Sequence, residues 1–296
     1  MPVLYPHDYN DVQQLSARSF TSSITPNATQ RTTLIVAGCY ILIIGILWHV
    51  PHLKLIIYPF KLLTVGFHEM GHAFVGVLTC AHIHSIELDP DEGGATRLSG
   101  GVTWLTLPAG YLGSSLIGAA LIACGFDTNA SKVACLVLAV FFVCTLWWAR
   151  RNLLTWVLLL GVSGLIALFW FLNEGEVLRF LVLFIGVMSC LYVLWDVIDD
   201  TIARKVNASD ATAFAKIYGC FPSQVWGVIW LIIAFMFFIL GGLVGIIAFK
   251  ESTAQQEQDA KHFLPVPGSN GAIALSLSTP LALILGTLST TLLALL

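Results

Sequence analysis

Seven long apolar runs, separated by short polar segments, organise the sequence. A helix needs about 20 apolar residues to cross the hydrocarbon of a bilayer, so runs of this length predict transmembrane helices. The predicted helices cover residues 33–50, 58–80, 102–126, 133–148, 153–172, 177–195 and 225–249. A last apolar run, 272–296, is rich in Ser and Thr and contains Pro280. Three interpretations of this run stay open: an eighth span, a surface segment, or a segment that packs poorly.

The polar interruption after the second run has the pattern of a β-hairpin. His82–Leu88 shows partial period-two alternation, which predicts a strand. Residues 89–94 have the Asp, Pro and Gly content of a turn, and residues 95–99 are predicted to return as a second strand. An ordinary connecting loop is the alternative. A hairpin beside the preceding helix would offer an edge on which an extended peptide pairs.

The composition supports a membrane protein. The chain of 296 residues is 57% hydrophobic and 10% charged, and its mean hydropathy is +0.85, whereas soluble domains carry about 25% charged residues. The predicted fold class is therefore an all-α polytopic membrane protein with about seven transmembrane helices, or eight, and a small β-hairpin-like insertion after the second helix. A net charge of −3 gives no sign of nucleic-acid binding. Seven scattered cysteines form no C-x-x-C pair and indicate small buried hydrophobes.

The chain divides by composition into four parts. Residues 1–31 form a polar N-terminal tail, and residues 32–249 form the transmembrane domain. Residues 250–271 are a polar, Gln-rich linker, for which we expect no regular structure. Residues 272–296 are the apolar C-terminal segment of open role.

Small and capping residues predict further local features. Ser209 and Asp210, just before Ala211 and Thr212, indicate a helix N-cap within the polar linker after the sixth run. Two series of small residues in the second and third runs predict helix faces that neighbouring backbones approach closely. The series are Gly66, Gly71 and Gly76, and Gly110, Ser114 and Gly118.

An H-E-x-x-H motif in the second run is the main candidate for chemistry. On a helix, His68 and His72 lie one turn apart on the same face, where both imidazoles can bind one metal ion. Glu69 lies beside that face, placed to take a proton from a water on the metal. The alternative is two core histidines and a buried Glu that fall in register by chance. Ionisable side chains are costly in hydrocarbon and are seldom there without a role, which favours the metal site.

A third metal ligand must come from elsewhere, because catalytic zinc usually takes three protein ligands. Asp196, Asp199 and Asp200 end the sixth run at i, i+3 and i+4, on one helical face. Asp196 is the most deeply embedded carboxylate after Glu69, so it is the first candidate, followed by Asp199 and Asp200. Asp210 ranks last. An acidic helix end in interfacial water is the competing interpretation of the cluster.

The predicted cofactor is one Zn²⁺ per chain, bound by two histidines and an aspartate. Imidazole and carboxylate ligands also suit iron or manganese, so zinc is inferred from the H-E-x-x-H motif rather than from the ligand types alone.

The motif and its surroundings resemble the site-2 protease class of intramembrane metalloproteases. The resemblance is closer to an M50B-type peptidase-like branch of small multispan proteins of fungi, plants and bacteria. It covers roughly residues 57–245. The segments that carry it are H-E-x-G-H at 68–72, Ala-Gly-Tyr-x-Gly at 109–113, Asp196-x-x-Asp199-Asp200, Ser-Asp-Ala at 209–211 and Trp-Gly-Val-Ile-Trp at 226–230.

This resemblance implies zinc-dependent cleavage of membrane-embedded substrates, with His68 and His72 as ligands and Glu69 as catalytic acid and base. One departure concerns the third ligand. Site-2 proteases supply it from an Asp-Gly motif in a later span, and this chain contains no Asp-Gly dipeptide. Asp196 or one of its neighbours would have to replace it.

The expected function is that of an intramembrane zinc metalloendopeptidase. Its expected partners are membrane lipid and transmembrane or membrane-associated protein substrates, and its oligomeric state and membrane stay open. One alternative is a non-catalytic scaffold or chaperone of the same fold; the intact Glu69 favours the enzyme, since a scaffold needs no general base. The other is a metal or proton transporter, against which the sequence shows no convincing inverted repeat.

Overall fold

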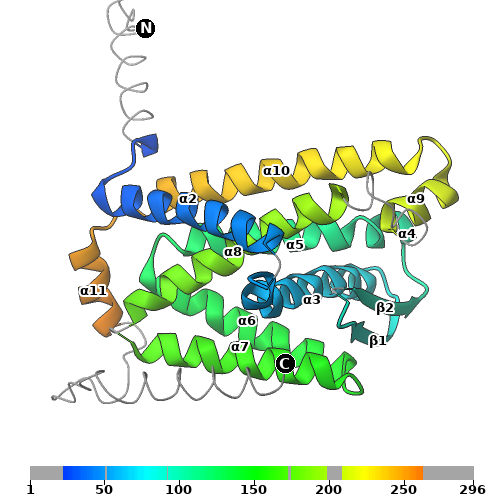
Figure 1. The fold of residues 1–296 in the computed structure, drawn as a ribbon, viewed down its shortest axis with the longest axis horizontal. Helices are drawn as coiled ribbons and strands as arrows, with labels where there is room; N and C mark the ends of the chain where they lie inside the picture. Colours follow the sequence, from blue (N-terminus) through cyan, green and yellow to red (C-terminus); the bar gives the residue numbers. More distant parts are fainter. Residues whose placement is uncertain (1–22, 51, 92, 173–174, 199–208, 263–296) are drawn as a thin grey trace, which may run out of the picture. The chain divides into compact units, whose positions relative to one another are not determined.

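The computed structural model describes residues 23–50, 52–91, 93–172, 175–198 and 209–262. All of these lie in the first of two compact units, residues 1–264; the second unit is residues 265–296. Figure 1 shows the order of elements in the first unit. They are α2 (Ala28–His49), α3 (Lys54–Leu78), β1 (His82–Leu88), β2 (Gly94–Ser99), α4 (Thr103–Thr106), α5 (Ala109–Cys124), α6 (Thr128–Trp148), α7 (Leu153–Phe171), α8 (Glu176–Ile198), α9 (Asp210–Tyr218), α10 (Ser223–Ala248) and α11 (Thr253–His262).

Five described helices are long and apolar enough to cross a membrane: α2, α6, α7, α8 and α10. They match five of the predicted spans, and the helical fold class is confirmed. The second and third predicted spans correspond to α3 and to α5, and α5 has only 16 residues. A total of seven or eight spans is therefore not confirmed, and the run 272–296 lies outside the described residues.

Helix α8 is the buried centre of the helical bundle. It contacts α2, α3, α5, α6, α7 and α10, and most of its membrane-length stretch is buried. The helices around it expose large apolar side chains outward, among them Leu42, Val140, Leu160 and Met236. An outer surface of this kind suits lipid rather than water.

Helix α5 approaches its neighbours through small residues. A Cβ at Gly118 would lie 3.0 Å from the carbonyl oxygen of Gly186 in α8, and a Cβ at Gly186 would lie 2.8 Å from that of Gly118. A Cβ at Gly241 of α10 would lie 2.6 Å from the carbonyl oxygen of Ala119. The backbones therefore touch, which confirms the tight packing predicted at Gly118.

The third predicted span is not one continuous helix. The chain forms the short helix α4, and α5 begins only after Pro108. Proline lacks a backbone N–H and its ring clashes with the carbonyl of the preceding turn, so it starts helices more readily than it continues them. The break leaves the carbonyl of Thr106 facing α3, where it becomes a hydrogen-bond acceptor of the site.

The hairpin predicted after the second span is present. Strands β1 and β2 pair antiparallel, with His82 opposite Ser99 and Leu88 opposite Gly94. Both strands pack against α3 (Figure 1). Ile86 is fully buried in the cluster that joins β1 to Met70 of α3, which fixes the hairpin on the helix of the H-E-x-x-H motif.

The polar segment after α10 differs from the expectation of no regular structure. Helix α11 forms at Thr253–His262 and packs on α6. The buried Gln256 side chain donates a hydrogen bond to the carbonyl oxygen of Phe126 at 3.0 Å, and Lys132 Nζ donates one to the carbonyl oxygen of Ala260 at 3.0 Å. These long-range contacts order a segment whose composition alone suggests a linker.

Candidate metal site

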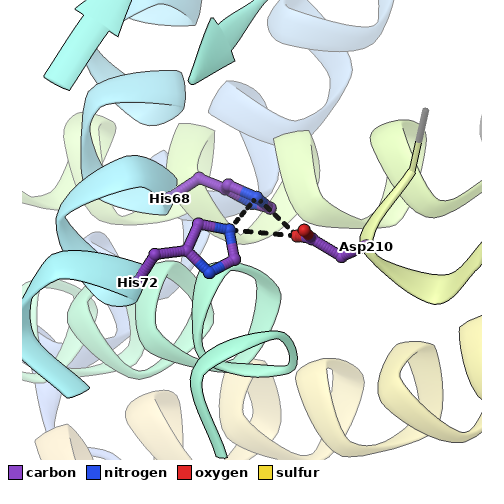
Figure 2. A group of neighbouring side chains, drawn as sticks. All are labelled: His68, His72 and Asp210. Atoms are coloured by element: carbon purple, nitrogen blue, oxygen red, sulfur yellow. Dashed lines mark hydrogen bonds and ion pairs between the residues drawn. The ribbon is translucent and has the colours of Figure 1, made fainter. Parts of the chain in front are cut away.

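Helix α3 places the two histidines of the motif on one face, as predicted. The Nε2 atoms of His68 and His72 lie 3.0 Å apart (Figure 2). His72 and Glu69 are buried, and His68 is partly exposed. A continuous helix through this segment is what makes the i, i+4 spacing bring both rings together.

Asp210 supplies the third side chain. Ser209 caps α9 by accepting a hydrogen bond from the Thr212 backbone N–H, so the predicted N-cap is present and Asp210 is the first helical residue. Its Oδ2 atom lies 3.0 Å from Nε2 of His68 and 3.0 Å from Nε2 of His72. Figure 2 shows the three side chains converging from α3 and α9. Among the described residues, these three form the group of His, Cys, Asp and Glu able to share one metal ion.

The sequence ranking of the aspartates does not match this geometry. Asp196, the first candidate, lies on the same cavity and accepts a hydrogen bond from the Tyr192 hydroxyl at 3.4 Å, but it lies outside the group formed with the histidines. Asp199 and Asp200 lie outside the described residues. Asp210, ranked last, lies beside the two histidines, because the chain returns through α9 to the motif helix; the depth of a residue within an apolar run does not predict that return.

The partners of the two ring nitrogens of His72 indicate whether a metal ion fits between His72 and Asp210. Its Nδ1 lies 2.7 Å from the carbonyl oxygen of Thr106, which can only accept, so Nδ1 carries the proton. The Nε2 of the neutral ring then presents a lone pair toward the carboxylate of Asp210. Two acceptors at 3.0 Å repel each other unless a proton or a metal ion lies between them and relieves the repulsion.

The dimensions also suit a metal ion. The three candidate ligand atoms are each 3.0 Å from the other two. Tetrahedral zinc with bonds of about 2.0 Å separates its ligand atoms by roughly 3.3 Å, so a small adjustment suffices. The bond from His72 to a backbone carbonyl is the kind of partner that orients metal-binding histidines. The residues present therefore fit zinc.

Glu69 is held by the hairpin. The Thr96 hydroxyl lies 2.7 Å from Oε2 of Glu69 and 2.9 Å from the Glu69 carbonyl oxygen. A Cβ at Gly94 would lie only 2.5 Å from Oε1 of Glu69, so the strand passes directly over the carboxylate. Glu69, the two histidines and Asp210 line one cavity of about 470 Å³. Neither Thr96 nor Gly94 stands out in the sequence, where the predicted hairpin is the only signal for them.

A comparison with protein-family models assigns the chain to a family. A family model described as Peptidase M50B-like matches residues 37–241, more than half of the chain. This protein belongs to the Peptidase M50B-like family. No curated protein and no solved structure matches the chain. The family and the five long apolar helices together make it an integral, multi-pass membrane protein.

In this M50B-like protein, the backbone of α5 lies directly against the imidazole rings of His68 and His72. A Cβ at Gly110 would meet Nε2 of His72 at 2.5 Å and Cε1 of His68 at 2.5 Å. A Cβ at Gly71 would collide with the carbonyl oxygen of Ala109. Glycine at these two positions lets α3 and α5 approach until the imidazoles rest on the α5 backbone.

Aromatic rings pack against His68 and against the helix that carries Asp210. The Tyr111 ring lies edge to face with the His68 ring at 4.7 Å and packs against Trp230 of α10 at 5.7 Å. Phe214 of α9 packs against Trp226 and Trp230 at 4.7 Å and 5.5 Å. The Ala-Gly-Tyr and Trp-Gly-Val-Ile-Trp segments of the M50B-like resemblance thus meet behind the site and fix α9, which carries Asp210.

Proposed function

We propose that this protein is an intramembrane zinc metalloendopeptidase that hydrolyses peptide bonds of membrane-embedded substrates. The convergence of His68, His72 and Asp210 at 3.0 Å, with Glu69 on the same cavity, carries the proposal. The family supports a membrane protease. The proposed metal ligands are His68, His72 and Asp210.

Each side chain has a defined part in the proposed reaction. Bound zinc supplies Lewis-acid polarisation of the scissile carbonyl and lowers the pKa of water. Glu69 removes a proton from the attacking water and delivers it to the nitrogen of the leaving amine. Thr96 donates a hydrogen bond to the Glu69 carboxylate and so holds its orientation toward the cavity. The carbonyl of Thr106 holds the ring of His72.

The cavity meets the needs of hydrolysis inside a membrane. Water and an unwound stretch of substrate must both reach the carboxylate, because a helical peptide bond is hidden by its own hydrogen bonds. The cavity of about 470 Å³ has carboxylates, hydroxyls and imidazoles among its apolar lining residues, and these polar groups can form hydrogen bonds with both. A scaffold would not need a buried Glu held by a hydroxyl beside the histidines, so this arrangement favours the enzyme over the scaffold.

Glu69→Gln in the purified full-length protein tests the proposal. We expect about one zinc per chain, as in the wild type, with cleavage of fluorogenic transmembrane peptides in vesicles reduced by at least about 100-fold, since general base catalysis contributes 10²–10⁴-fold. Glu251→Gln is the control, because Glu251 is exposed in the segment between α10 and α11 and does not line this cavity. Cleavage by Glu69→Gln at the wild-type rate would refute the role of Glu69.

A further inference from the structure

A second cavity, of about 290 Å³, lies between β1 and the turn that joins α6 to α7. Three arginines line it, one from β2 and two from the turn: Arg97, Arg150 and Arg151. Trp148 and Asn152 line it as well. We refer to it as the arginine cavity. It shares no lining residue with the metal site.

The arginine cavity carries excess positive charge. Glu87 is its lining carboxylate, and Arg97 Nη2 neutralises it with a hydrogen bond to Oε2 at 3.2 Å. No carboxylate in the described part of the chain lies within 4.0 Å of the guanidinium groups of Arg150 and Arg151. Two guanidinium groups therefore face this space with no described acidic partner, which favours an anionic ligand.

The position of the cavity relative to the membrane follows from the two flanking helices. Helices α6 and α7 are both long and apolar enough to span, and only residues 149–152 join them. The turn must therefore lie at a membrane–water boundary. The tryptophans on either side of the turn are exposed, Trp147 to 71% and Trp156 to 37%. Exposed tryptophans are common at the level where helices leave the hydrocarbon of the membrane. Arg150 and Arg151 consequently lie at the level of lipid headgroups.

The walls of the cavity are fixed to each other. Asn152 Nδ2 donates a hydrogen bond to the carbonyl oxygen of Leu88 at 2.8 Å, which ties the turn to the end of β1. Asn152 Oδ1 accepts from the Thr155 backbone N–H at 2.9 Å and caps α7. The N-terminus of α7, with its partial positive charge, thus begins beside the two arginines.

From the charge, the membrane level and the fixed walls, we propose that the arginine cavity binds the phosphate headgroup of an anionic phospholipid. Guanidinium groups bind phosphate with paired hydrogen bonds, which ammonium groups cannot do as well. The headgroup would hold β1 at the membrane surface. The same hairpin holds Glu69 through Thr96 on β2, so the lipid would set the position of the strand that orients this carboxylate.

The test is native mass spectrometry of the full-length protein, delipidated in detergent and titrated separately with phosphatidylglycerol, phosphatidylcholine and inorganic phosphate. We expect one phosphatidylglycerol to bind preferentially. The double variant Arg150→Gln/Arg151→Gln should bind it roughly twenty-fivefold more weakly, because each basic side chain at an anionic surface contributes about fivefold. The double variant Arg150→Lys/Arg151→Lys should bind phosphatidylglycerol with an affinity between those of the wild type and of the glutamine variant, since the charge remains but the paired hydrogen bonds are lost.

Arg31→Gln/Lys54→Gln is the matched control, since it removes two positive charges from exposed positions outside the cavity. Equal weakening of lipid binding in the control and in the arginine-cavity variant would overturn the proposal, and so would unchanged binding in the latter. Binding of inorganic phosphate as tight as that of phosphatidylglycerol would identify a free-phosphate site and likewise overturn it. Zinc content and peptide cleavage, measured in parallel, test the metal site separately.

Discussion

Gly110→Ala is the most discriminating change that the structure offers, because it alters the site without replacing a proposed ligand. The new Cβ would lie 2.5 Å from Nε2 of His72, whereas ordinary van der Waals contact begins at 3.4 Å. The imidazole or the α5 backbone must therefore move by 0.9 Å, the difference between these two distances. His68 meets the same obstacle, since its Cε1 would also lie 2.5 Å from the Cβ.

A displacement of this size exceeds what a metal site tolerates. Metal–ligand distances vary by only about 0.2 Å, so two ligands displaced by several times that amount lose most of their affinity. We expect zinc to bind more than about 100-fold more weakly, beyond the effect of losing an outer hydrogen-bond partner. Zinc per chain after dialysis against a zinc buffer, together with peptide cleavage, measures the effect.

Gly242→Ala is the control for Gly110→Ala. Gly242 also lies inside a helix, α10, but a Cβ there would meet nothing within 4 Å. The control should keep full zinc and full cleavage, and both variants should stay monodisperse in detergent. If Gly110→Ala retains zinc and cleavage like Gly242→Ala, then the imidazoles do not rest on α5 as described, and the account of the site is wrong.

Three further predictions follow from the contacts of the site. Thr96→Val removes the hydroxyl that donates a hydrogen bond to Glu69, and a hydrogen bond to a charged group is worth about 1.5–3 kcal/mol, so kcat should fall about tenfold or more with zinc retained. Thr96→Ser keeps the hydroxyl and should restore kcat. A normal kcat in Thr96→Val would count against the positioning of Glu69 by the hairpin. Asp196→Asn should keep its zinc, because Asp196 lies outside the three-residue group; zinc loss by atomic spectroscopy would return Asp196 to the ligand set. Removal of metal with 1,10-phenanthroline should abolish cleavage and added zinc should restore it, whereas full activity in metal-free protein would exclude the proposed chemistry.

Local sequence signals predicted the local features of the site well. The spacing of His68 and His72 placed both rings together because helical periodicity alone determines that proximity. The alternation of His82–Leu88 indicated the strand, and Ser209 indicated the start of α9. Each of these features depends on residues only a few positions apart.

Features that depend on distant contacts could not be predicted in the same way. The choice of Asp196 over Asp210 rested on depth within an apolar run, but α9 and its aromatic contacts with α10 decide which carboxylate reaches the histidines. Gly110 was recognised as part of a packing face, yet its contact with both imidazoles follows only from the approach of α5 to α3. The order in α11 likewise comes from Gln256, which bonds to a carbonyl 130 positions away in sequence.

The zinc content of purified wild-type protein and of Asp210→Asn tests the central claim most directly. If His68, His72 and Asp210 hold the metal, the wild type carries about one zinc per chain and Asp210→Asn loses nearly all of it under the same dialysis, because three protein ligands are the usual minimum for catalytic zinc. A wild type without zinc, or an Asp210→Asn variant that keeps a full equivalent, would contradict the claim.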